Sequence, residues 1–239
     1  MLNEKGGIRM EKRVCIIYTG GTIGMTPTER GYAPLPGGLQ RALESSGIAP
    51  GPGLPAWDLI ELDPLLDSSD MTVREWDLIA RAIRRHYDCY DGFVVLHGTD
   101  TMAYTASALS FMLEGLQKPV VLTGSQLPIE HPLTDGIDNL RTAFAMAASG
   151  APGVFLAFDR KVMLGCRAVK VRASGFSAFE SVNARYAALV SNRGLVVDKD
   201  VLPRRTGESR LLSDISKEVF LLKLTPGLNP SVFDMLAAM

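Results

Sequence analysis

The sequence predicts an α/β fold, a doubly wound and mostly parallel sheet, followed by only the start of a second, smaller α/β domain. Three observations lead to this prediction. Several short apolar runs lack the apolar–polar alternation of a half-exposed strand, segments of helical periodicity separate them, and glycine-rich turns follow some of the runs. Strands that alternate with helices of this length indicate βαβ units, which build parallel sheets.

The expected strands are the apolar runs themselves. Runs without alternation are typical of strands covered on both faces, as in a parallel sheet. One further run, residues 57–62, alternates in part and is also expected to be a strand. The continuous runs are residues 14–18, 93–96, 120–122 and 154–158.

Three helices are expected between these strands, over residues 72–87, 103–113 and 135–148. The first begins with Thr72 followed by Glu75, a spacing that predicts a capping box. The second consists almost entirely of small and apolar residues, which predicts deep burial.

The pattern changes after residue 158. Residues 161–171 and 187–197 are expected to be extended, hairpin-type segments, and residues 198–214 are polar and irregular, as in a linker. An apolar strand is expected at 219–224, followed by a short apolar helix, which would open a second domain that the chain does not complete. The expected division is an N-terminal extension over 1–12, a main domain over 13–197, a linker over 198–216 and the truncated start of a C-terminal domain over 217–239.

Composition excludes several classes of function. A formal net charge of -1 provides no basic footprint for nucleic acid, and the apolar runs are far shorter than a bilayer span. The first residues lack the apolar stretch of a secretion signal, so a cytoplasmic protein is expected. Three isolated cysteines predict reduced, buried thiols, and the three histidines show no ligand spacing, so neither a metal site nor a cofactor is expected.

The strongest functional signal is the sequence TGGTIG at residues 19–24, directly after the first strand. Ligands of parallel α/β sheets bind beyond the carboxyl ends of the strands. Glycines there allow a sharp turn and a close approach of the backbone to a ligand. The pattern is neither GxGxxG nor a P-loop, so dinucleotide and nucleotide phosphates are not indicated. A threonine hydroxyl in such a turn can act as a nucleophile if a base activates it.

Two other polar turns follow predicted strands. HGTDT at residues 97–101 places a hydroxyl beside a carboxylate, and DSSDM at residues 67–71 offers further hydroxyls and carboxylates. Both segments fit helix capping and loop solvation as well as an active site. Together the three turns predict a small polar substrate with hydrogen-bonding groups, without identifying it.

The motifs TGGTIG at residues 19–24 and HGTDTM at residues 97–102 together resemble the two signature motifs of the L-asparaginase family. The resemblance is closest to the bacterial cytoplasmic, type I, enzymes, and it covers nearly the whole chain from Arg13 onward. It implies that the predicted sheet is the N-terminal domain of an asparaginase. Further matching segments are residues 67–71, 92–97, 123–126 and 135–140.

By this resemblance the reaction is the hydrolysis of L-asparagine to L-aspartate and ammonia. Thr22 would attack the side-chain amide carbon and form an acyl-enzyme ester, which water then hydrolyses. Tyr32 corresponds to a mobile-loop tyrosine and would help to move the proton of Thr22. Thr99, Asp100 and Lys170 would form a second catalytic group that holds water and shuttles protons.

The resemblance also implies a binding site for the substrate. Asp67 and Ser68 correspond to the substrate-binding segment, in which Ser68 would bind the substrate carboxylate and Asp100 its ammonium group. Backbone amides around Thr22 and Thr99 would form an oxyanion hole. His97 is expected to be a buried, hydrogen-bonded structural residue without a catalytic role.

The family also implies a homodimer or homotetramer, in which the second domain of a neighbour completes each active site. L-asparagine would be the main substrate and L-glutamine a weaker one, since one methylene changes binding by only about 1–3 kcal/mol. Two other functions remain open. One is a non-catalytic amino-acid-binding remnant, and the other is an ammonia-supplying subunit of a tRNA amidotransferase, which shares this fold.

Overall fold

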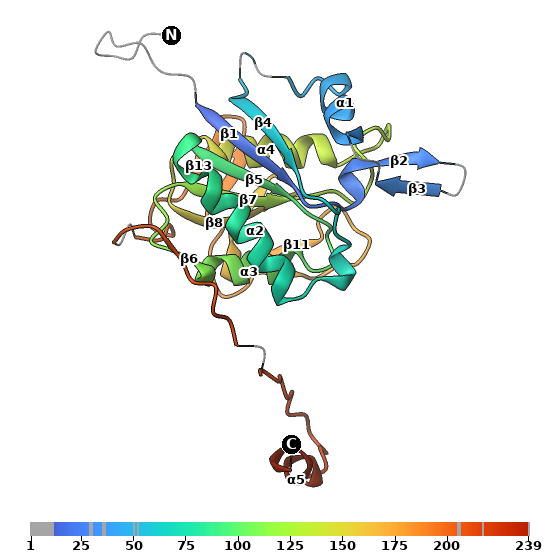
Figure 1. The fold of residues 1–239 in the computed structure, drawn as a ribbon, viewed down its shortest axis with the longest axis vertical. Helices are drawn as coiled ribbons and strands as arrows, with labels where there is room; N and C mark the ends of the chain where they lie inside the picture. Colours follow the sequence, from blue (N-terminus) through green and yellow to red (C-terminus); the bar gives the residue numbers. More distant parts are fainter. Residues whose placement is uncertain are drawn as a thin grey trace.

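A computed structural model describes residues 12–28, 31–34, 37–49, 51, 53–204, 207–216 and 218–238, and its centre is an eight-stranded sheet (Figure 1). The strand order is β13-β12-β9-β8-β7-β5-β1-β4. The strands from β4 to β8 in this order are parallel to one another, and β9, β12 and β13 are antiparallel to their neighbours. The predicted doubly wound, mostly parallel sheet is therefore confirmed. The bounds are β1 Arg13–Tyr18, β4 Ala56–Glu61, β5 Gly92–Leu96, β7 Pro119–Thr123, β8 Gly153–Phe158, β9 Lys161–Leu164, β12 Ala188–Ser191 and β13 Gly194–Val197.

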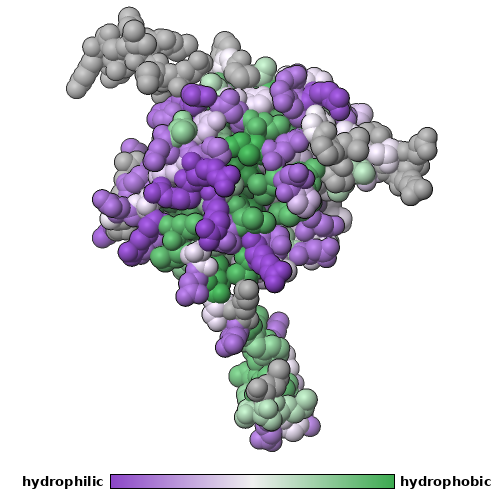
Figure 2. Space-filling view, viewed as in Figure 1, coloured by the Kyte–Doolittle hydropathy of each residue, from purple (hydrophilic) through white to green (hydrophobic). Residues whose placement is uncertain are grey.

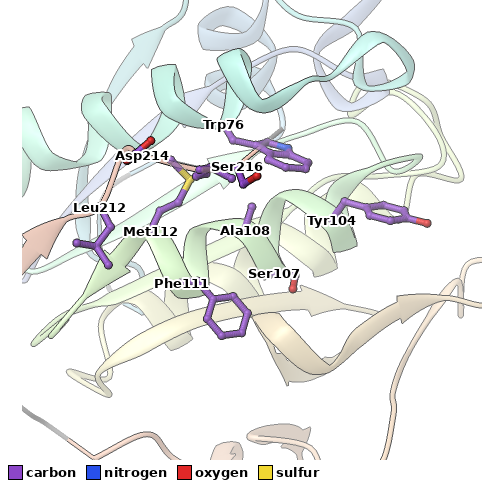
Figure 3. Close-up of a pocket in the computed structure, with 10 residues that line it drawn as sticks. Trp76, Tyr104, Ser107, Ala108, Phe111, Met112, Leu212, Asp214 and Ser216 are labelled. Carbon is purple, nitrogen blue, oxygen red and sulfur yellow. The ribbon is translucent and has the colours of Figure 1, made fainter. Parts of the chain in front are cut away.

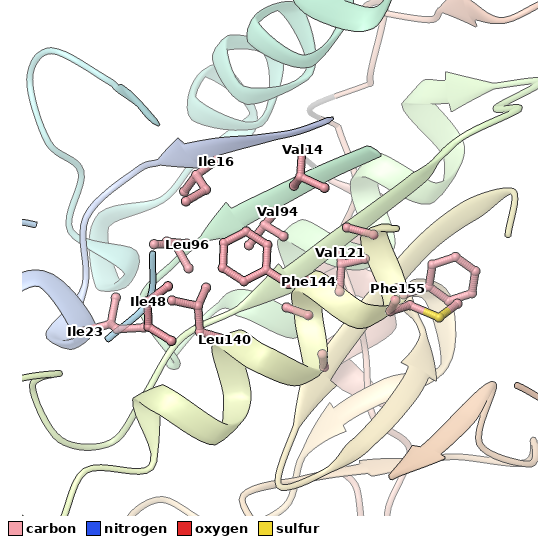
Figure 4. Close-up of a cluster of buried hydrophobic side chains, with 14 of the residues drawn as sticks. Val14, Ile16, Ile23, Ile48, Val94, Leu96, Val121, Leu140, Phe144 and Phe155 are labelled. Carbon is pink, nitrogen blue, oxygen red and sulfur yellow. The ribbon is translucent and has the colours of Figure 1, made fainter. Parts of the chain in front are cut away.

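Helices cover both faces of the sheet. On one face, α1 (Gly38–Ser45) and α4 (Gly136–Ala147) pack with the side chains at alternate positions of β1 and β5, such as Ile16 and Val94 (Figure 4). On the other face, α2 (Val73–His86) and α3 (Met102–Met112) pack with the remaining side chains of β1 and β5, such as Ile17 and Val95. Because successive side chains of a strand point to opposite faces, these continuous apolar runs supply both cores.

The predicted helices correspond to α2, α3 and α4, whereas α1 was not predicted. The capping box is present at α2, where the Thr72 side chain accepts from the Arg74 amide and Glu75 accepts from the Thr72 amide. The uncharged helix α3 buries Ala106 and Leu109, but Tyr104 and Phe111 are exposed on its outer side. Its predicted deep burial therefore holds for one side of the helix only.

The order of connections creates a topological switch point between β1 and β5. From β1 the chain passes through α1 to β4 on one side, and from β5 it passes through α3 to β7 on the other side. Adjacent strands whose connections leave in opposite directions open a crevice at their carboxyl ends. The turns that begin at Thr19 and His97 follow these two strands, so the fold brings the two signature motifs together.

Short two-stranded sheets accompany the eight-stranded sheet. A hairpin of β2 (Met25–Thr28) and β3 (Gly31–Pro34) follows the first signature turn. The predicted extended segment at 161–171 contains β9 and then β10 (Ala168–Lys170), which pairs with β11 (Phe179–Ser181) instead of with β9. The segment at 187–197 is the predicted hairpin of β12 and β13, which forms one edge of the eight-stranded sheet.

The C-terminal region differs from the prediction in two ways. Part of the expected linker is bound to the body, because β14 (Arg210–Leu211) pairs with β6 (Leu113–Glu114). The described residues 218–224 form no strand, because no other strand pairs with them, and Val219, Phe220 and Leu221 are largely exposed. The segment runs away from the body to α5 (Ser231–Ala237), the expected short helix (Figure 1). The surface of this C-terminal part is largely hydrophobic (Figure 2).

The cysteines correct a further expectation. Cys15 is buried, and burial raises the pKa of its thiol to about 12, but Cys89 and Cys166 are exposed. All three are free thiols. Within the described ranges, no helix combines the length and the apolar character needed to cross a bilayer. The expected extension over residues 1–12 lies outside the described residues except for Lys12, which forms an ion pair with Asp91.

Candidate active site

The turn after β1 is shaped by two glycines. Gly20 and Gly21 have φ angles of 128° and 91°, which side-chain-bearing residues rarely adopt. A Cβ atom on Gly20 would lie 2.2 Å from the Leu66 carbonyl oxygen, and one on Gly21 would lie 2.5 Å from the Gly98 amide nitrogen. The turns after β1, β4 and β5 therefore touch backbone to backbone, with no side chain between them.

The two threonines of this turn have different environments. Thr19 is fully buried, and its hydroxyl donates to the Leu96 carbonyl oxygen at 2.9 Å, so it joins β1 to β5. Thr22 begins a 3₁₀ turn, Thr22–Gly24, and lines a cavity. Within the described part of the chain, no group is hydrogen-bonded to the Thr22 hydroxyl. Thr22 is thus the threonine of this turn that is available to a ligand.

The second predicted group is assembled. The Lys170 ammonium donates to the Thr99 hydroxyl oxygen at 3.0 Å and to Asp100 Oδ1 at 2.8 Å. The Lys170 side chain is only 17% exposed and that of Asp100 is 66% exposed, so the pair lies at the edge of the cavity. Lys170 is placed by β10, far along the chain from the turn that it contacts.

A residue without a predicted role completes this group. The Thr99 hydroxyl donates to Gln126 Oε1 at 3.4 Å, and Gln126 Nε2 donates to the carbonyl oxygens of Ala173 and Gly175, each at 3.1 Å. The Asp135 carboxylate in turn accepts from the backbone N–H of Gln126. Gln126 therefore links the second signature turn to the segment that follows Lys170. The sequence offered one indication that Gln126 matters, because it lies in the segment 123–126 that matches the family. Nothing in that segment indicated which residues Gln126 would contact.

The turn after β4 forms the third wall of the cavity. Asp67 accepts from the backbone amide of Ser69 at 2.9 Å and from its hydroxyl at 2.8 Å, and these hydrogen bonds lower the pKa of the Asp67 carboxyl below its ordinary value. Ser68 is buried, and a Cβ on Gly98 would lie 2.3 Å from its hydroxyl oxygen. Thr101 donates to the Ser68 carbonyl oxygen at 2.6 Å, which ties this turn to the second signature turn.

The cavity between the three turns has a volume of about 360 Å³. This size and its polar lining suit a small polar ligand. Tyr32 is not among the described residues that line it. This tyrosine lies on β3, opposite Pro27, and is 51% exposed, so its role near the Thr22 hydroxyl stays a prediction. The other predicted site residues either line the cavity or, like Lys170, bind residues that line it: Thr22, Asp67, Ser68, Thr99, Asp100 and Lys170.

Within the described ranges, no group of three His, Cys, Asp or Glu side chains could hold a metal ion. The arrangement instead offers a hydroxyl that has no partner among the described residues, a second hydroxyl beside an ammonium group and a carboxylate, and backbone amides at the carboxyl ends of two strands. This set of groups suits acyl transfer by a hydroxyl nucleophile.

His97, the first residue of the second signature motif, is buried and hydrogen-bonded, as predicted. Its Nδ1 lies 2.7 Å from the Gly98 carbonyl oxygen, and its Nε2 lies 2.9 Å from the Thr105 hydroxyl. Burial lowers the pKa of His97 to about 4. The imidazole is therefore neutral at neutral pH.

This pKa predicts a pH dependence of stability. Between pH 6.5 and about 4, the unfolded chain binds a proton at His97 that the folded chain does not bind, so the free energy of unfolding falls as the pH falls through this window. The loss should reach roughly 3 kcal/mol at most, since each pKa unit corresponds to about 1.4 kcal/mol. Urea unfolding at several pH values should show a shallower fall for His97→Gln, which does not titrate. Parallel curves for the two proteins would contradict the assignment of this slope to His97.

Comparisons with known proteins agree with the fold and the motifs. A family model described as "Asparaginase, N-terminal" matches residues 13–202. L-asparaginase 1 of Escherichia coli (strain K12) is 51% identical over 174 residues, which cover 72% of this chain and 52% of that protein. The crystal structure of L-asparaginase I from Vibrio cholerae O1 biovar eltor str. N16961 superposes with a TM-score of 0.85 at 41% identity, over 93% of this chain and 67% of that one.

A relative of another kind is a glutamyl-tRNA(Gln) amidotransferase subunit of Aeropyrum pernix, which is 39% identical over 95% of this chain and 56% of its own length. The chain thus spans about half the length of this relative and of the Escherichia coli enzyme. The family model alone covers most of the chain. This chain therefore belongs to the asparaginase family.

Proposed function

We propose that this chain carries the catalytic part of an L-asparaginase, which hydrolyses L-asparagine to L-aspartate and ammonia through an acyl-enzyme on Thr22. One observation carries the proposal. The Thr22 hydroxyl, which has no hydrogen-bond partner among the described residues, lines the same cavity as Thr99 and Asp100 at the switch point of the sheet, and Lys170 is bonded to both of these residues. The similarity to proteins named L-asparaginase supports the choice of substrate.

In the first half-reaction, the Thr22 oxygen attacks the side-chain amide carbon of asparagine, and the C–N bond breaks to release ammonia. Thr22 suits this role better than Thr99, whose oxygen accepts from the Lys170 ammonium and whose proton is directed to Gln126. The hydroxyl proton of Thr22 must pass to the leaving nitrogen. We assign its transfer to Tyr32, which the hairpin β2–β3 would have to bring to Thr22.

In the second half-reaction, water attacks the ester carbon, aspartate leaves and the Thr22 hydroxyl is restored. Thr99, Asp100 and Lys170 would hold this water, because they form one hydrogen-bonded group at the cavity. The proton of the water would pass through the Asp100 carboxylate to the Thr22 oxygen as the ester bond breaks. Backbone amides of the two glycine-rich turns would stabilise the oxyanion in both steps.

The charged ends of the substrate fit the rest of the lining. Asp67 and Asp100 carry negative charge toward a substrate ammonium group, and the Ser68 hydroxyl would donate to the substrate carboxylate. L-glutamine should be a weaker substrate of the same cavity. Further parts of the proposal are a cytoplasmic location and a homodimer or homotetramer, in which a neighbouring protomer completes each site.

A second candidate rests on the similarity to the amidotransferase of Aeropyrum pernix. The same chemistry would then supply ammonia to a partner enzyme that acts on tRNA, with glutamine as the donor. A third candidate, a non-catalytic binder of aspartate or asparagine, would use the same cavity without acyl transfer.

The test is an assay of the purified chain with L-asparagine and L-glutamine, in which ammonia and the amino-acid product are both measured. Release of ammonia and aspartate in equal amounts, faster from asparagine, is expected. A preference for glutamine would favour the amidotransferase role. Saturable aspartate binding without any ammonia release would refute the catalytic proposal.

A further inference from the structure

Three hydrogen bonds link the surface of the protein to the second signature turn. The Trp76 indole nitrogen donates to the Thr105 hydroxyl oxygen at 3.1 Å, Thr105 contacts His97 Nε2 at 2.9 Å, and His97 Nδ1 contacts the Gly98 carbonyl oxygen at 2.7 Å. Figure 3 shows Trp76 extending from α2 toward Ala108 of α3, in a groove between the two helices. The chain of bonds therefore runs from this groove to the active-site turn.

The chemistry at both ends fixes the direction of every bond. An indole N–H can only donate, so the Thr105 oxygen accepts from Trp76 and its own proton is free to reach His97 Nε2. A carbonyl can only accept, so His97 Nδ1 must carry a proton to bond to Gly98. The hydrogen bonds at both imidazole nitrogens are satisfied by the same neutral tautomer, which carries its proton on Nδ1. A low pKa of about 4 keeps the ring in this neutral form.

This bond determines how the peptide between Gly98 and Thr99 is oriented. The only cis peptide among the described residues is Asp63–Pro64, so the Gly98–Thr99 peptide is trans, and its C=O and N–H point in opposite directions. His97 holds the carbonyl, so the Thr99 N–H points away from the imidazole. Within the described part of the chain, no group accepts from the Thr99 N–H, and Gly98 and Thr99 both line the cavity.

Packing alone leaves this orientation open. Gly98 lies between Gly21 and Ser68, with contacts close enough to exclude a Cβ atom on Gly21 or on Gly98 itself. Contacts of this kind restrict where the backbone lies, but a small glycine peptide can still rotate about its flanking bonds. A directional hydrogen bond to the carbonyl removes that freedom.

We propose that His97 is a positioning residue, which holds the Gly98 carbonyl so that the Thr99 amide N–H faces the oxyanion formed during acyl transfer. The inference rests on the proposed amidohydrolase function and deepens it. His97 does not touch the substrate. It acts through the peptide that follows it, and Thr105 and Trp76 hold the imidazole in the tautomer that this task requires.

Two substitutions of His97 separate this role from a general effect on packing. The side-chain amide of asparagine can place an N–H near the position of Nδ1, whereas that of glutamine extends toward the position of Nε2 and Thr105. His97→Gln should therefore lower kcat about 100-fold, the usual effect of losing one oxyanion donor, with KM changed by less than about threefold. His97→Asn should keep kcat within about tenfold of the wild type. Thermal unfolding of both variants verifies that they are folded.

A second measurement does not depend on turnover. Nitrogen-15 NMR of histidine-labelled wild-type protein should show a protonated Nδ1 and an unprotonated Nε2 for His97. The Thr99 amide resonance should shift when aspartate binds to the wild type and to His97→Asn, but not to His97→Gln.

The outcomes are distinct. If the wild type releases no ammonia, the proposed function fails, and the tautomer and the Thr99 shift still test the role of His97. If His97→Gln does not fold, the tautomer of His97 measured in the wild type tests the inference. A proton on Nε2, or equal losses of kcat in the two variants, would overturn the inference.

Discussion

Replacing Thr22 with alanine should slow ammonia release from L-asparagine at least about a thousandfold, since no covalent intermediate can then form. In the first signature turn, Thr22 carries the hydroxyl that lines the cavity, and this hydroxyl has no hydrogen-bond partner among the described residues. Removing it leaves Asp67, Ser68 and Asp100 in place. The affinity for aspartate, measured by calorimetry, should therefore change little.

Thr19 provides a matched control three residues earlier. Its hydroxyl is buried and bonded to the Leu96 carbonyl oxygen, which also accepts from the Thr19 amide. Thr19→Val should therefore lower the free energy of unfolding by about 1 kcal/mol and leave kcat nearly unchanged. Turnover by Thr22→Ala comparable to that of the wild type would remove Thr22 from the nucleophile role. Equal losses in both variants would point to the shape of the turn instead of its hydroxyl.

Gly21→Ala should destabilise the protein by roughly 4 kcal/mol or more, as expected for a substitution that combines backbone strain with a severe clash. The new Cβ would lie 2.5 Å from the Gly98 amide nitrogen and 2.6 Å from the Gly98 Cα, at a φ angle of 91°. Both contacts are backbone atoms, which cannot move aside as a flexible side chain can. Urea unfolding measures the loss, and ammonia release should fall with it because the two signature turns are forced apart.

Gly47→Ala separates strain from the clash. Gly47 also has a positive φ angle, 71°, but a Cβ there would have no neighbour within 4 Å. Its substitution should cost only about 1–2 kcal/mol, the usual penalty for a left-handed conformation, and should leave turnover unchanged. If the two substitutions destabilise the protein equally, the close backbone contact between the turns is not what makes glycine necessary at position 21.

Much of the fold could be predicted because single segments carry its signal. Apolar runs such as residues 93–96 form strands buried on both faces, and the spacing between Thr72 and Glu75 predicts a cap that involves only neighbouring residues. The segment at 219–224 has the same apolar character, yet it forms no strand. Strand formation needs a second segment to accept and donate hydrogen bonds, and local composition does not reveal whether one is available.

The candidate site could be predicted only where it depends on position within a turn. Thr22 and Thr99 follow strands whose carboxyl ends meet, so their proximity follows from the parallel sheet. Gln126 and Thr105 depend on side-chain contacts between segments that are distant in sequence, and no local pattern indicates such contacts. The exposure of Tyr32 has a similar origin, since it depends on the direction in which the hairpin β2–β3 leaves the body.

The direct contact between the turns after β1, β4 and β5 limits how this cavity can change. Its floor is formed where the main chain of Gly21 lies against that of Gly98, so a replacement at Gly21 would disturb both signature turns together. The walls are less constrained, because Met25 and Leu65 contribute side chains to the lining. Redesign for amides of another size would thus begin at these two walls, and an unchanged floor would keep the chemistry common to all such variants.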